Sequence, residues 1–502
     1  MSVTVILPTT LRNFTAKESE CTVEAGSVQE ALEALVALYP EAGPIIFDEQ
    51  GKIRSFLNIF VNSDNVRYAE GTATPLHDND TLTIIPAIAG GSGEGEARTD
   101  EEGAGSAPSE DKPQALIPPE RAVKLDNDEV LRYSRHLLLQ EIGIKGQKKL
   151  KGARVLVAGA GGLGAPLCLY LAAAGVGTIG IADFDLVDAT NLQRQVIHGQ
   201  RDIGRPKTAS ARDSIRAINP KIKVEVFEGL NADNIEEIVS SFDVVADGTD
   251  NYVARYLISD ACVKTHKPDV FGAIYQFEGQ VTVFYPPYSP CYRCLYPAPP
   301  PPGLVPTCSQ SGVLGAIAGI IGSIQANEVI KLLVGGGEPL LGKLLTMDIW
   351  HNRFNVLNIP RDPHCVTCAN PESLGPLTEI DYEDLCGLKQ EAQEEPVESI
   401  EALELKRRLD AGESITVVDV REPHERAIVK FPGAVVIPIG QLSRRQNELD
   451  PTCDTVFICK EGQRSILAIR TLREAGYTGR CFNLKDGINT WARDVDRSLP
   501  QY

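Results

Sequence analysis

Six of the twelve cysteines stand where a thiolate could do chemistry. Cys308 precedes a predicted helix, and Cys459 opens the loop Cys-Lys-Glu-Gly-Gln-Arg. The other four form two C-x-x-C pairs with the spacing of a metal site, namely Cys291 with Cys294 and Cys365 with Cys368. A thiolate is a metal ligand or a nucleophile according to its surroundings. The arrangement therefore predicts one metal site and two reactive thiols, and it favours sulfur chemistry.

A glycine-rich turn between a strand and a helix predicts a nucleotide site. Residues 154–158 are typical of a buried strand, Gly-Ala-Gly-Gly-Leu-Gly follows at 159–164, and a helix is expected over 165–174. Asp183 follows the next expected strand, 178–182, about twenty residues on. Glycines let the backbone approach phosphates at a helix N-terminus, and the acid binds a ribose hydroxyl. This fingerprint alone fits an NAD enzyme as well as an ATP enzyme.

The segment after this fingerprint carries cations and acids that favour phosphate chemistry. The groups are Asp183-Phe-Asp185, Asn191-Leu-Gln-Arg194, Gly204-Arg-Pro-Lys207 and Asp247-Gly-Thr-Asp250-Asn251. Arg194 and Lys207 offer positive charge where a reacting phosphate develops negative charge, and Asp250 could hold Mg²⁺. A nicotinamide site needs apolar walls instead, so a nicotinamide-dependent dehydrogenase is the disfavoured alternative.

From Leu131-Arg-Tyr-Ser-Arg135 to Cys368 the chain resembles the MoeB/ThiF adenylating family, relatives of the ubiquitin-activating enzymes. The resemblance implies a Rossmann-like domain, and it implies that Arg135 reaches the phosphates of a partner subunit in a homodimer. Arg194 is expected to act in catalysis as well as in binding. The residues implied to bind ATP and its Mg²⁺ are Gly162, Asp183, Asn191, Arg194, Lys207, Asp250 and Asn251.

The same resemblance assigns the cysteines of this domain. Cys291, Cys294, Cys365 and Cys368 match a tetrahedral Zn²⁺ site that staples the domain and does no chemistry, with two disulfides as the alternative. Cys308 matches the active-site cysteine of the family's crossover loop, ahead of a helix expected over 316–333. A buried, inert thiol is the alternative for Cys308.

The first segment, 1–91, has the pattern of a small α+β roll. Val3, Val5 and Leu7 alternate as in a strand, a helix is expected over 27–38, and strands are expected over 56–61 and 81–86. Ser27 and Glu30 form the start signal of that helix.

The layout resembles the ubiquitin-like (β-grasp) sulfur carriers of the ThiS, MoaD and CysO kind, and the segment ends in Gly90-Gly91. Without Cβ atoms, such a tail can thread through a narrow channel and bring a carboxyl group to a nucleotide. The alternative is that the two glycines merely begin a linker.

The last segment, 397–502, resembles a rhodanese α/β domain over its full length. It carries Val418-Asp-Val-Arg421-Glu and a six-residue loop from Cys459 to Arg464. Backbone N–H groups of such a loop stabilise a persulfide anion on the cysteine, and related phosphatases use a loop one residue longer. The chain has Val429-Lys-Phe where the family usually has His before Pro-Gly-Ala. Cys459 and Arg464 are therefore the expected catalytic pair of a sulfurtransferase.

Composition and two stretches with the composition of linkers indicate an α/β multidomain chain. We expect a carrier at 1–91, a flexible acidic linker at 92–122, an adenylyltransferase at 123–370, a linker at 371–396 and a rhodanese domain at 397–502. The formal charge of −19 argues against nucleic acid or an anionic membrane as partner. No run of 18 apolar residues or export signal is evident, so we expect a cytoplasmic protein.

The three resemblances imply one pathway. ATP adenylates a diglycine carboxylate, and a Cys459 persulfide, loaded by a cysteine desulfurase or by thiosulfate, attacks it. Cys308 then forms a disulfide with Cys459 and leaves a thiocarboxylate on the carrier. Because Gly91 is followed by Ser92, the carrier is either residues 1–91 after cleavage by a processing protease or a separate chain, with the fused domain an inert docking module. The end product stays open among cysteine, molybdopterin, thiamin and thiolated tRNA.

Overall fold

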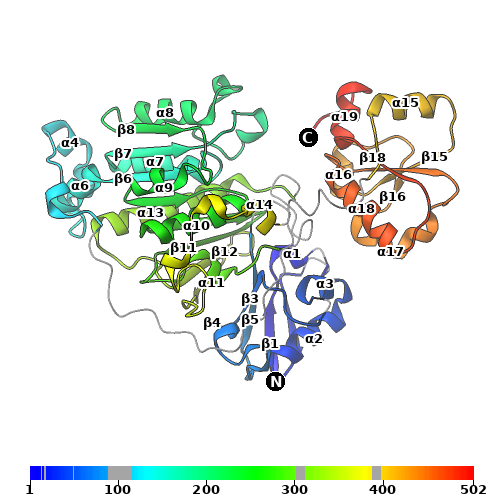
Figure 1. Ribbon diagram of the computed structural model, residues 1–502, viewed down its shortest axis with the longest axis horizontal. Helices are drawn as coiled ribbons and strands as arrows, with labels where there is room; N and C mark the ends of the chain where they lie inside the picture. Colours follow the sequence, from blue (N-terminus) through cyan, green and yellow to red (C-terminus); the bar gives the residue numbers. More distant parts are fainter. Residues whose placement is uncertain (13, 16–17, 49, 89–115, 301–310, 387–396) are drawn as a thin grey trace. The chain divides into compact units, whose positions relative to one another are not determined.

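A mixed β-sheet with one long helix on its face forms the amino-terminal part of the molecule, the β-grasp arrangement that the sequence predicts (Figure 1). Its elements are β1 (Ser2–Ile6), α1 (Thr9–Arg12), β2 (Glu20–Glu24), α2 (Val28–Leu38), α3 (Gly43–Ile46), β3 (Leu57–Val61), β4 (Asp64–Asn65) and β5 (Thr81–Pro86). Ser27 caps α2 as expected, since its hydroxyl accepts a hydrogen bond from the N–H of Glu30 at 3.3 Å. The structure, a computed structural model, describes residues 1–12, 14–15, 18–48, 50–88, 116–300, 311–386 and 397–502.

The central part is a doubly wound sheet with helices on both faces. Its first half comprises α4 (Asn127–Arg132), α5 (Ser134–Leu137), α6 (Gly143–Gly152), β6 (Arg154–Ala158), α7 (Gly164–Ala174), β7 (Thr178–Ala182), α8 (Lys207–Ile218) and β8 (Lys223–Phe227). Its second half comprises α9 (Ile235–Ser240), β9 (Val244–Asp247), α10 (Tyr252–Thr265), β10 (Asp269–Tyr275), β11 (Glu278–Phe284), α11 (Tyr292–Leu295), α13 (Gly315–Val334), β12 (Lys343–Asp348) and β13 (Arg353–Asn358). The strands predicted at 154–158 and 178–182 are confirmed.

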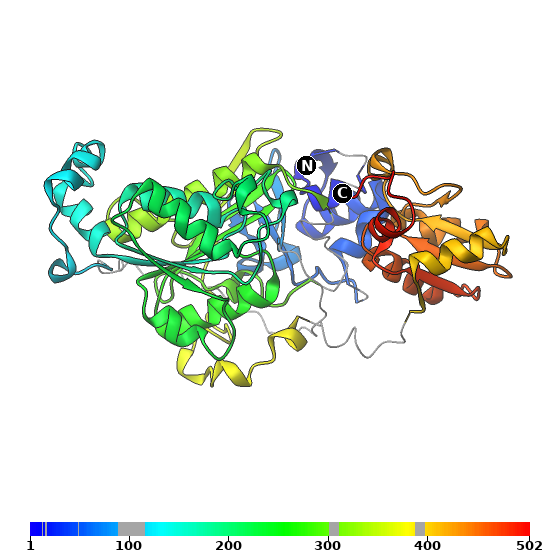
Figure 2. The same ribbon diagram turned by 90° about the horizontal axis from the view of Figure 1, so that it is seen from above.

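The two sheets are continuous through one edge contact. The order is β2-β1-β5-β3-β4-β13-β12-β11-β10-β9-β6-β7-β8, with β4 and β13 paired at Asp64 and Asn358. The N–H of Asn358 donates to the carbonyl of Ser63 at 2.8 Å. One cluster of buried apolar side chains runs through both parts. Residues 1–389 accordingly form one compact unit, in which the blue strands adjoin the green ones in both views (Figures 1 and 2).

Strand order in the parallel part fixes where a ligand can bind. β6 lies between β7 and β9, so the chain leaves β6 toward one side of the sheet and later returns to the other side. At such a switch point the loops after the two strands diverge and leave a crevice at their carboxyl ends. The glycine turn follows β6, and the segment from Asp247 to Asn251 ends β9 and begins α10, so both predicted motifs lie at this crevice.

Both segments expected to be linkers pack against the central domain over part of their length. Ile117 is fully buried, and Arg121 donates to both carboxylate oxygens of Asp243, beside the amino ends of β6 and β9. Beyond β13, Tyr382 in α14 (Tyr382–Leu385) donates to Asp260 of α10 at 3.0 Å. The first part of one segment, 92–115, and the last part of the other, 387–396, lie outside the described residues.

Helix α13 is long and apolar enough to cross a membrane by length and composition, with a mean hydropathy of 1.5. It packs on α7, β10 and β11, and its 18-residue window is 56% buried inside the protein. Ile317, Ile321 and Val329 are completely buried. We therefore assign α13 as a core helix, in agreement with the helix expected over 316–333.

The second unit, Gln390–Tyr502, is a five-stranded parallel sheet in the order β14-β18-β17-β15-β16. Its strands are β14 (Ser399–Ile400), β15 (Ile415–Asp419), β16 (Val435–Val436), β17 (Asp454–Ile458) and β18 (Cys481–Leu484). Its helices are α15 (Ala402–Asp410), α16 (Pro423–Ile428), α17 (Leu442–Arg445), α18 (Gln463–Glu474) and α19 (Gly487–Asp494). All connections in such a sheet are crossovers, which agrees with the α/β domain expected here.

Two charged pairs stabilise this unit from within. Arg421 and Asp419 are fully buried and share two hydrogen bonds, of 2.9 and 2.8 Å. Glu425 of α16 accepts two hydrogen bonds from Arg464 of α18, at 2.7 and 2.5 Å. Burial raises the pKa of Glu425, but the hydrogen bonds and charge of Arg464 outweigh that effect and hold the pKa below its ordinary value. The ionised form of Glu425 is therefore the one that the fold stabilises.

The pKa of Glu425 is lower in the folded state than in the unfolded state. Its contribution to the free energy of unfolding is therefore fully present above the unfolded pKa, and it is lost as the pH falls through the folded pKa. We expect Glu425→Gln to lower the stability of this unit by about 3 kcal/mol at neutral pH, since it leaves Arg464 without a charged partner. The difference from the parent should shrink as the pH falls below about 4. Glu404→Gln, which breaks an exposed pair with Arg407, is the control. Denaturant unfolding across pH 3–8 measures both, and a constant difference would contradict the assignment.

Candidate functional site

The glycine turn has the close backbone packing that a phosphate loop needs. Gly159 has a φ of 88°, and its N–H donates to the carbonyl of Ala182 at 2.8 Å. A Cβ on Gly164 would lie 1.8 Å from the carbonyl oxygen of Gly159, so only glycine fits there. A Cβ on Gly159 would approach Gly248 to 3.0 Å, which places the loop after β9 directly beside the turn. The turn leads into α7, whose 11 residues present an N-terminus to the crevice.

Asp183 and Lys207 are fixed beside this turn. The carboxylate of Asp183 accepts from the N–H groups of Ala160 and Asp185 at 2.7 and 2.8 Å. Burial raises the pKa of Asp183, while Lys207 and the two N–H groups oppose the rise. Lys207 is buried at the start of α8 and donates to Asp185 at 2.7 Å.

The other residues predicted to bind ATP lie on the segments that surround this turn. The aliphatic part of Arg194 packs over Gly162, and its guanidinium donates to the carbonyl of Thr190 at 3.1 Å. Asn191 accepts from the N–H of Asp188, which rigidifies the segment that carries Arg194. Asp250 is exposed at the end of the loop after β9, and Asn251 caps α10 by accepting from Ala254 at 2.8 Å.

Arg135 stands apart from this group. It lies on α5, where its side chain is exposed, and within the described ranges no hydrogen bond or ion pair joins it to the other seven residues. Sequence reasoning also missed His198, which is buried under the turn and bonds to the carbonyl of Ala160 at 3.0 Å. Burial lowers the pKa of His198, which favours its neutral form.

The tail of the β-grasp part is bound by α10, next to the loop after β9. Tyr252 donates to the carbonyl of Ala87 at 3.1 Å, and Arg255 donates through one nitrogen to the carbonyl of Ile88. The other terminal nitrogen of Arg255 donates to the carbonyls of Thr249 at 2.8 Å and Gly272 at 3.3 Å. Arg255 thus joins the tail to the loop after β9. The one feature of the sequence that could have pointed to Arg255 is its position on α10, four residues after Asn251.

Gly90 and Gly91 lie outside the described residues, as does Cys308. Upstream of the diglycine, Gln280 and Tyr296 both donate to the carbonyl of Pro86, at 3.2 and 3.5 Å. Neither residue was predicted, because such contacts depend on how two distant parts of the chain meet. The tail is therefore held by side chains at three successive carbonyls before it leaves the described part.

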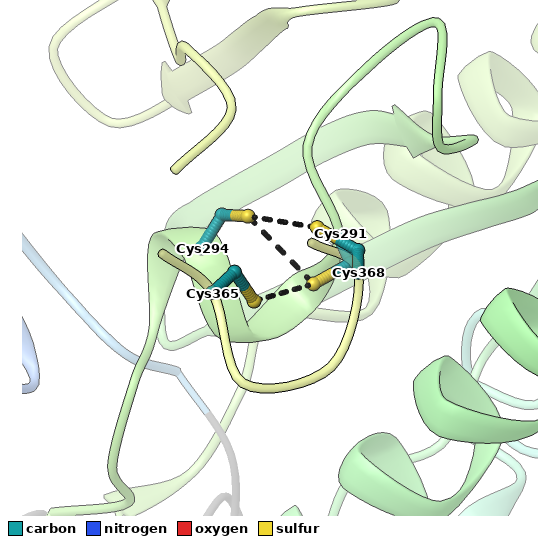
Figure 3. A group of neighbouring side chains, drawn as sticks. All are labelled: Cys291, Cys294, Cys365 and Cys368. Carbon is teal, nitrogen blue, oxygen red and sulfur yellow. Dashed lines mark hydrogen bonds between the residues drawn. The ribbon is translucent and has the colours of Figure 1, made fainter. Parts of the chain in front are cut away.

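The four cysteines form one cluster, although they come from segments more than seventy residues apart (Figure 3). Their sulfur atoms lie within 4.8 Å of one another, and the distances of Cys291 to Cys294, Cys291 to Cys365 and Cys294 to Cys368 are 3.7, 3.5 and 3.4 Å. These are too long for disulfides and close to the roughly 3.8 Å expected of four thiolates around one tetrahedral Zn²⁺. All four side chains are buried, so the donor set fits a closed structural metal site.

The second unit presents Cys459 in a turn between β17 and α18. Cys459 is 2% exposed, and the N–H of Gly462 donates to its sulfur at 3.0 Å. Gly462 has a φ of 94°, a conformation in which a side chain would be strained. Arg464 follows in the first turn of α18 and is held by Glu425. Val429, which departs from the rhodanese pattern, is buried, and its carbonyl accepts from Arg421 at 2.9 Å.

Models of three protein families match successive parts of the chain. The ThiS family matches residues 5–91, the ThiF family matches 133–367, and the rhodanese-like domain matches 401–494. The solved structure of E. coli MccB with ATP overlays 48% of this chain and 75% of its own, at 24% identity and a TM-score of 0.43.

Curated relatives carry the comparison further. The probable adenylyltransferase/sulfurtransferase MoeZ of Mycobacterium tuberculosis (strain ATCC 25618 / H37Rv) is 45% identical over 398 residues, which cover 77% of this chain and 99% of MoeZ. The adenylyltransferase and sulfurtransferase MOCS3 of Culex quinquefasciatus is 41% identical over 401 residues, covering 76% and 91%. MOCS3 of Arabidopsis thaliana is 40% identical over 411 residues, covering 77% and 88%. The chain therefore belongs to the adenylyltransferase/sulfurtransferase family that includes MoeZ and MOCS3.

Proposed function

We propose that the chain adenylates the diglycine end of its own β-grasp domain and then converts that end to a thiocarboxylate. The observation that carries the proposal is the bridge made by Arg255 between the carbonyl of Ile88 and that of Thr249. Three further residues extend about 10 Å at most, which is the reach from Ile88 to Gly91. This placement favours the fused domain as substrate over the alternative of an inert docking module.

In the first step, the carboxylate of Gly91 attacks the α-phosphate of ATP and pyrophosphate leaves. We assign ATP binding to the residues around the crevice, namely Gly162, Asp183, Asn191, Arg194, Lys207, Asp250 and Asn251. Arg194 also stabilises the charge that develops on phosphorus, because a fixed cation lowers the energy of such a transition state. Asp250, exposed beside the phosphate turn, would hold Mg²⁺, which supplies charge neutralisation of the phosphates.

In the second step, the terminal sulfur of a Cys459 persulfide attacks the acyl adenylate, and AMP leaves. The N–H of Gly462 and the fixed charge of Arg464 support the anionic sulfur. The thiolate of Cys308 then attacks the Cys459 sulfur, so that a Cys308–Cys459 disulfide forms and the carrier leaves as a thiocarboxylate. A cellular dithiol restores both thiols, and a cysteine desulfurase or thiosulfate reloads Cys459 with sulfur.

Adenylation requires a free carboxylate, yet Gly91 is joined to Ser92. We therefore propose cleavage after Gly91 by a protease, of the metalloprotease kind that trims ubiquitin-like tails. The stretch after Gly91 is polar and acidic, and exposed polar segments are where proteolysis concentrates. About 25 residues separate Gly91 from Ile117, and a flexible chain of that length spans roughly 28 Å r.m.s..

We further propose a cytoplasmic homodimer. Arg135 is flanked by Leu131 and Leu138, which are 77% and 76% exposed, and exposed apolar side chains of this kind favour a protein contact. The eleven cysteines within the described part are free of disulfides, which suits a reducing compartment.

Separate substitutions should divide the two activities. Cys459→Ala is expected to retain ATP–pyrophosphate exchange with the cleaved carrier and to lose thiocarboxylate formation, because adenylation precedes sulfur attack. Arg194→Ala should abolish exchange and leave thiosulfate-to-cyanide sulfur transfer near the parental rate. Cys453→Ala and Arg216→Ala, at accessible positions away from both sites, are the matched controls. Loss of exchange in folded Cys459→Ala protein, or NAD binding in place of exchange, would refute the proposal.

Cleavage should be visible in the protein taken from its own cell. Intact mass spectrometry is expected to find a fragment ending at Gly91, part of it heavier by the difference between sulfur and oxygen. Gly91→Val should block cleavage, whereas Gly103→Val, inside the linker, should not. Only full-length chain in cells that carry out the sulfur transfer would point to a separate carrier instead.

We assign the metal of the cysteine cluster as Zn²⁺, at one ion per chain. Cys294→Ser should lose the metal and lower the thermal midpoint, with a smaller effect on pyrophosphate exchange, since four thiolates leave no open coordination position. Cys262→Ser, another buried cysteine outside the cluster, should keep the metal. Unchanged metal content in Cys294→Ser, measured by mass spectrometry of the ion, would contradict this assignment.

A further inference from the structure

Two carboxylates of the central domain face each other where the β-grasp part docks. Glu278 begins β11 and Asp348 ends β12, and the antiparallel register pairs these two residues directly. Their side chains are only 13% and 9% exposed. Like charges directly opposite in a ladder repel each other, and burial strengthens the repulsion. The pair is therefore unfavourable unless a cation lies between its members.

Arg12 of the β-grasp part supplies that cation. One of its terminal nitrogens donates to Asp348 at 2.8 Å and to Glu278 at 3.1 Å. Its Nε donates to the carbonyl of Leu7 at 2.9 Å, which orients the guanidinium from within the β-grasp part. The N–H of Thr9, in the same short helix, donates to Glu278 at 2.9 Å. Arg12 itself is 7% exposed, so the cation is removed from water together with both acids.

His351 completes the group. Its Nδ1 lies 2.8 Å from Asp348 and 3.5 Å from Arg12. Burial raises the pKa of Glu278 to about 7, although Arg12 opposes the rise. Burial also raises the pKa of Asp348, but the hydrogen bonds of His351 and Arg12 outweigh that effect and hold this pKa below its ordinary value. Arg12 thus contacts two carboxylates and one imidazole. Among the described side chains that touch Glu278, Arg12 is the only cation.

A second ion pair across the same contact provides a comparison. Glu20 of β2 and Arg353 of β13 lie 2.6 Å apart, but their side chains are 51% and 26% exposed. An exposed pair is hydrated in either state and contributes little, whereas a buried charge that loses its partner is costly. The two pairs therefore differ in energy although both are short.

We propose that Arg12 is the residue by which the central domain recognises its carrier, so that an accepted carrier must place a cation between Glu278 and Asp348. The proposal rests on the proposed function only in taking residues 1–88 as the carrier. The partner that the central domain accepts is therefore a β-grasp domain with a guanidinium in the turn after its first strand. A carrier without that cation would leave two buried acids facing each other.

The test uses the full chain with a specific protease site placed between residues 92 and 115. After cutting, the dissociation constant of the two fragments is measured by native mass spectrometry over a dilution series. Arg12→Gln is expected to raise this constant about thirtyfold or more, and Arg12→Lys to raise it less. Glu20→Gln, at the exposed pair, should change it by less than about threefold. In the Glu278→Gln/Asp348→Asn background, Arg12→Gln should have little further effect, because the acids are gone.

An Arg12→Gln complex within threefold of the parent, or an equal loss for Glu20→Gln, would overturn the proposal. If Arg12→Gln unfolds the β-grasp part, the Asp348→Asn variant of the other fragment replaces it in the test. A weaker complex with Asp348→Asn supports the proposal, and an unchanged dissociation constant overturns it. No ATP or sulfur enters the measurement. A parental dissociation constant for Arg12→Gln therefore refutes the role of Arg12 in recognition and leaves the proposed reaction untouched. Absence of pyrophosphate exchange refutes the proposed reaction and leaves the role of Arg12 untouched.

Discussion

A buried guanidinium can persist only if carbonyls or acids satisfy it, and the arrangement of the first unit depends on how Arg255 meets that requirement. Arg255 is 2% exposed and lies 4.9 Å over the ring of Phe271. Its terminal nitrogens reach the carbonyls of Ile88, Thr249 and Gly272, which belong to the β-grasp tail, the loop after β9, and β10. Any displacement of the tail would leave a buried cation short of an acceptor. The position of the tail and the shape of the crevice are therefore coupled.

Other contacts hold the body of the β-grasp part against the central domain. Tyr68 donates to the carbonyl of Cys294 at 3.1 Å, and Asn58 donates to that of Leu295 at 2.9 Å. The cysteine cluster fixes the ends of this short segment, so a site with no chemistry of its own shapes the surface on which the β-grasp part lies. The edge pairing of β4 with β13 adds a directional constraint, since it fixes which way β3 and β5 run.

Local features of the sequence predicted the local structure well. The cap at Ser27, the turn at Gly159 to Gly164 and the two C-x-x-C pairs are contained within a few residues each, and short-range geometry determines them. The strand β2 was not predicted, because its Glu20–Glu24 sequence is mostly exposed and lacks a clear apolar alternation. Glu278 and Asp348 were not singled out either. Their meaning depends on strand register and on a side chain more than 260 positions away, which no local pattern encodes.

The covalent link between the two parts of the first unit has a consequence for turnover. While the linker is intact, it supplies the carrier at an effective concentration on the order of millimolar, so even a modest interface stays occupied. If the peptide bond after Gly91 is cut, as we propose, the same contacts must hold two molecules at cellular concentration. Occupancy then depends on the dissociation constant of the interface itself. Proteolysis would thus set when the product can leave and a fresh copy can enter, although it alters no contact between the two surfaces.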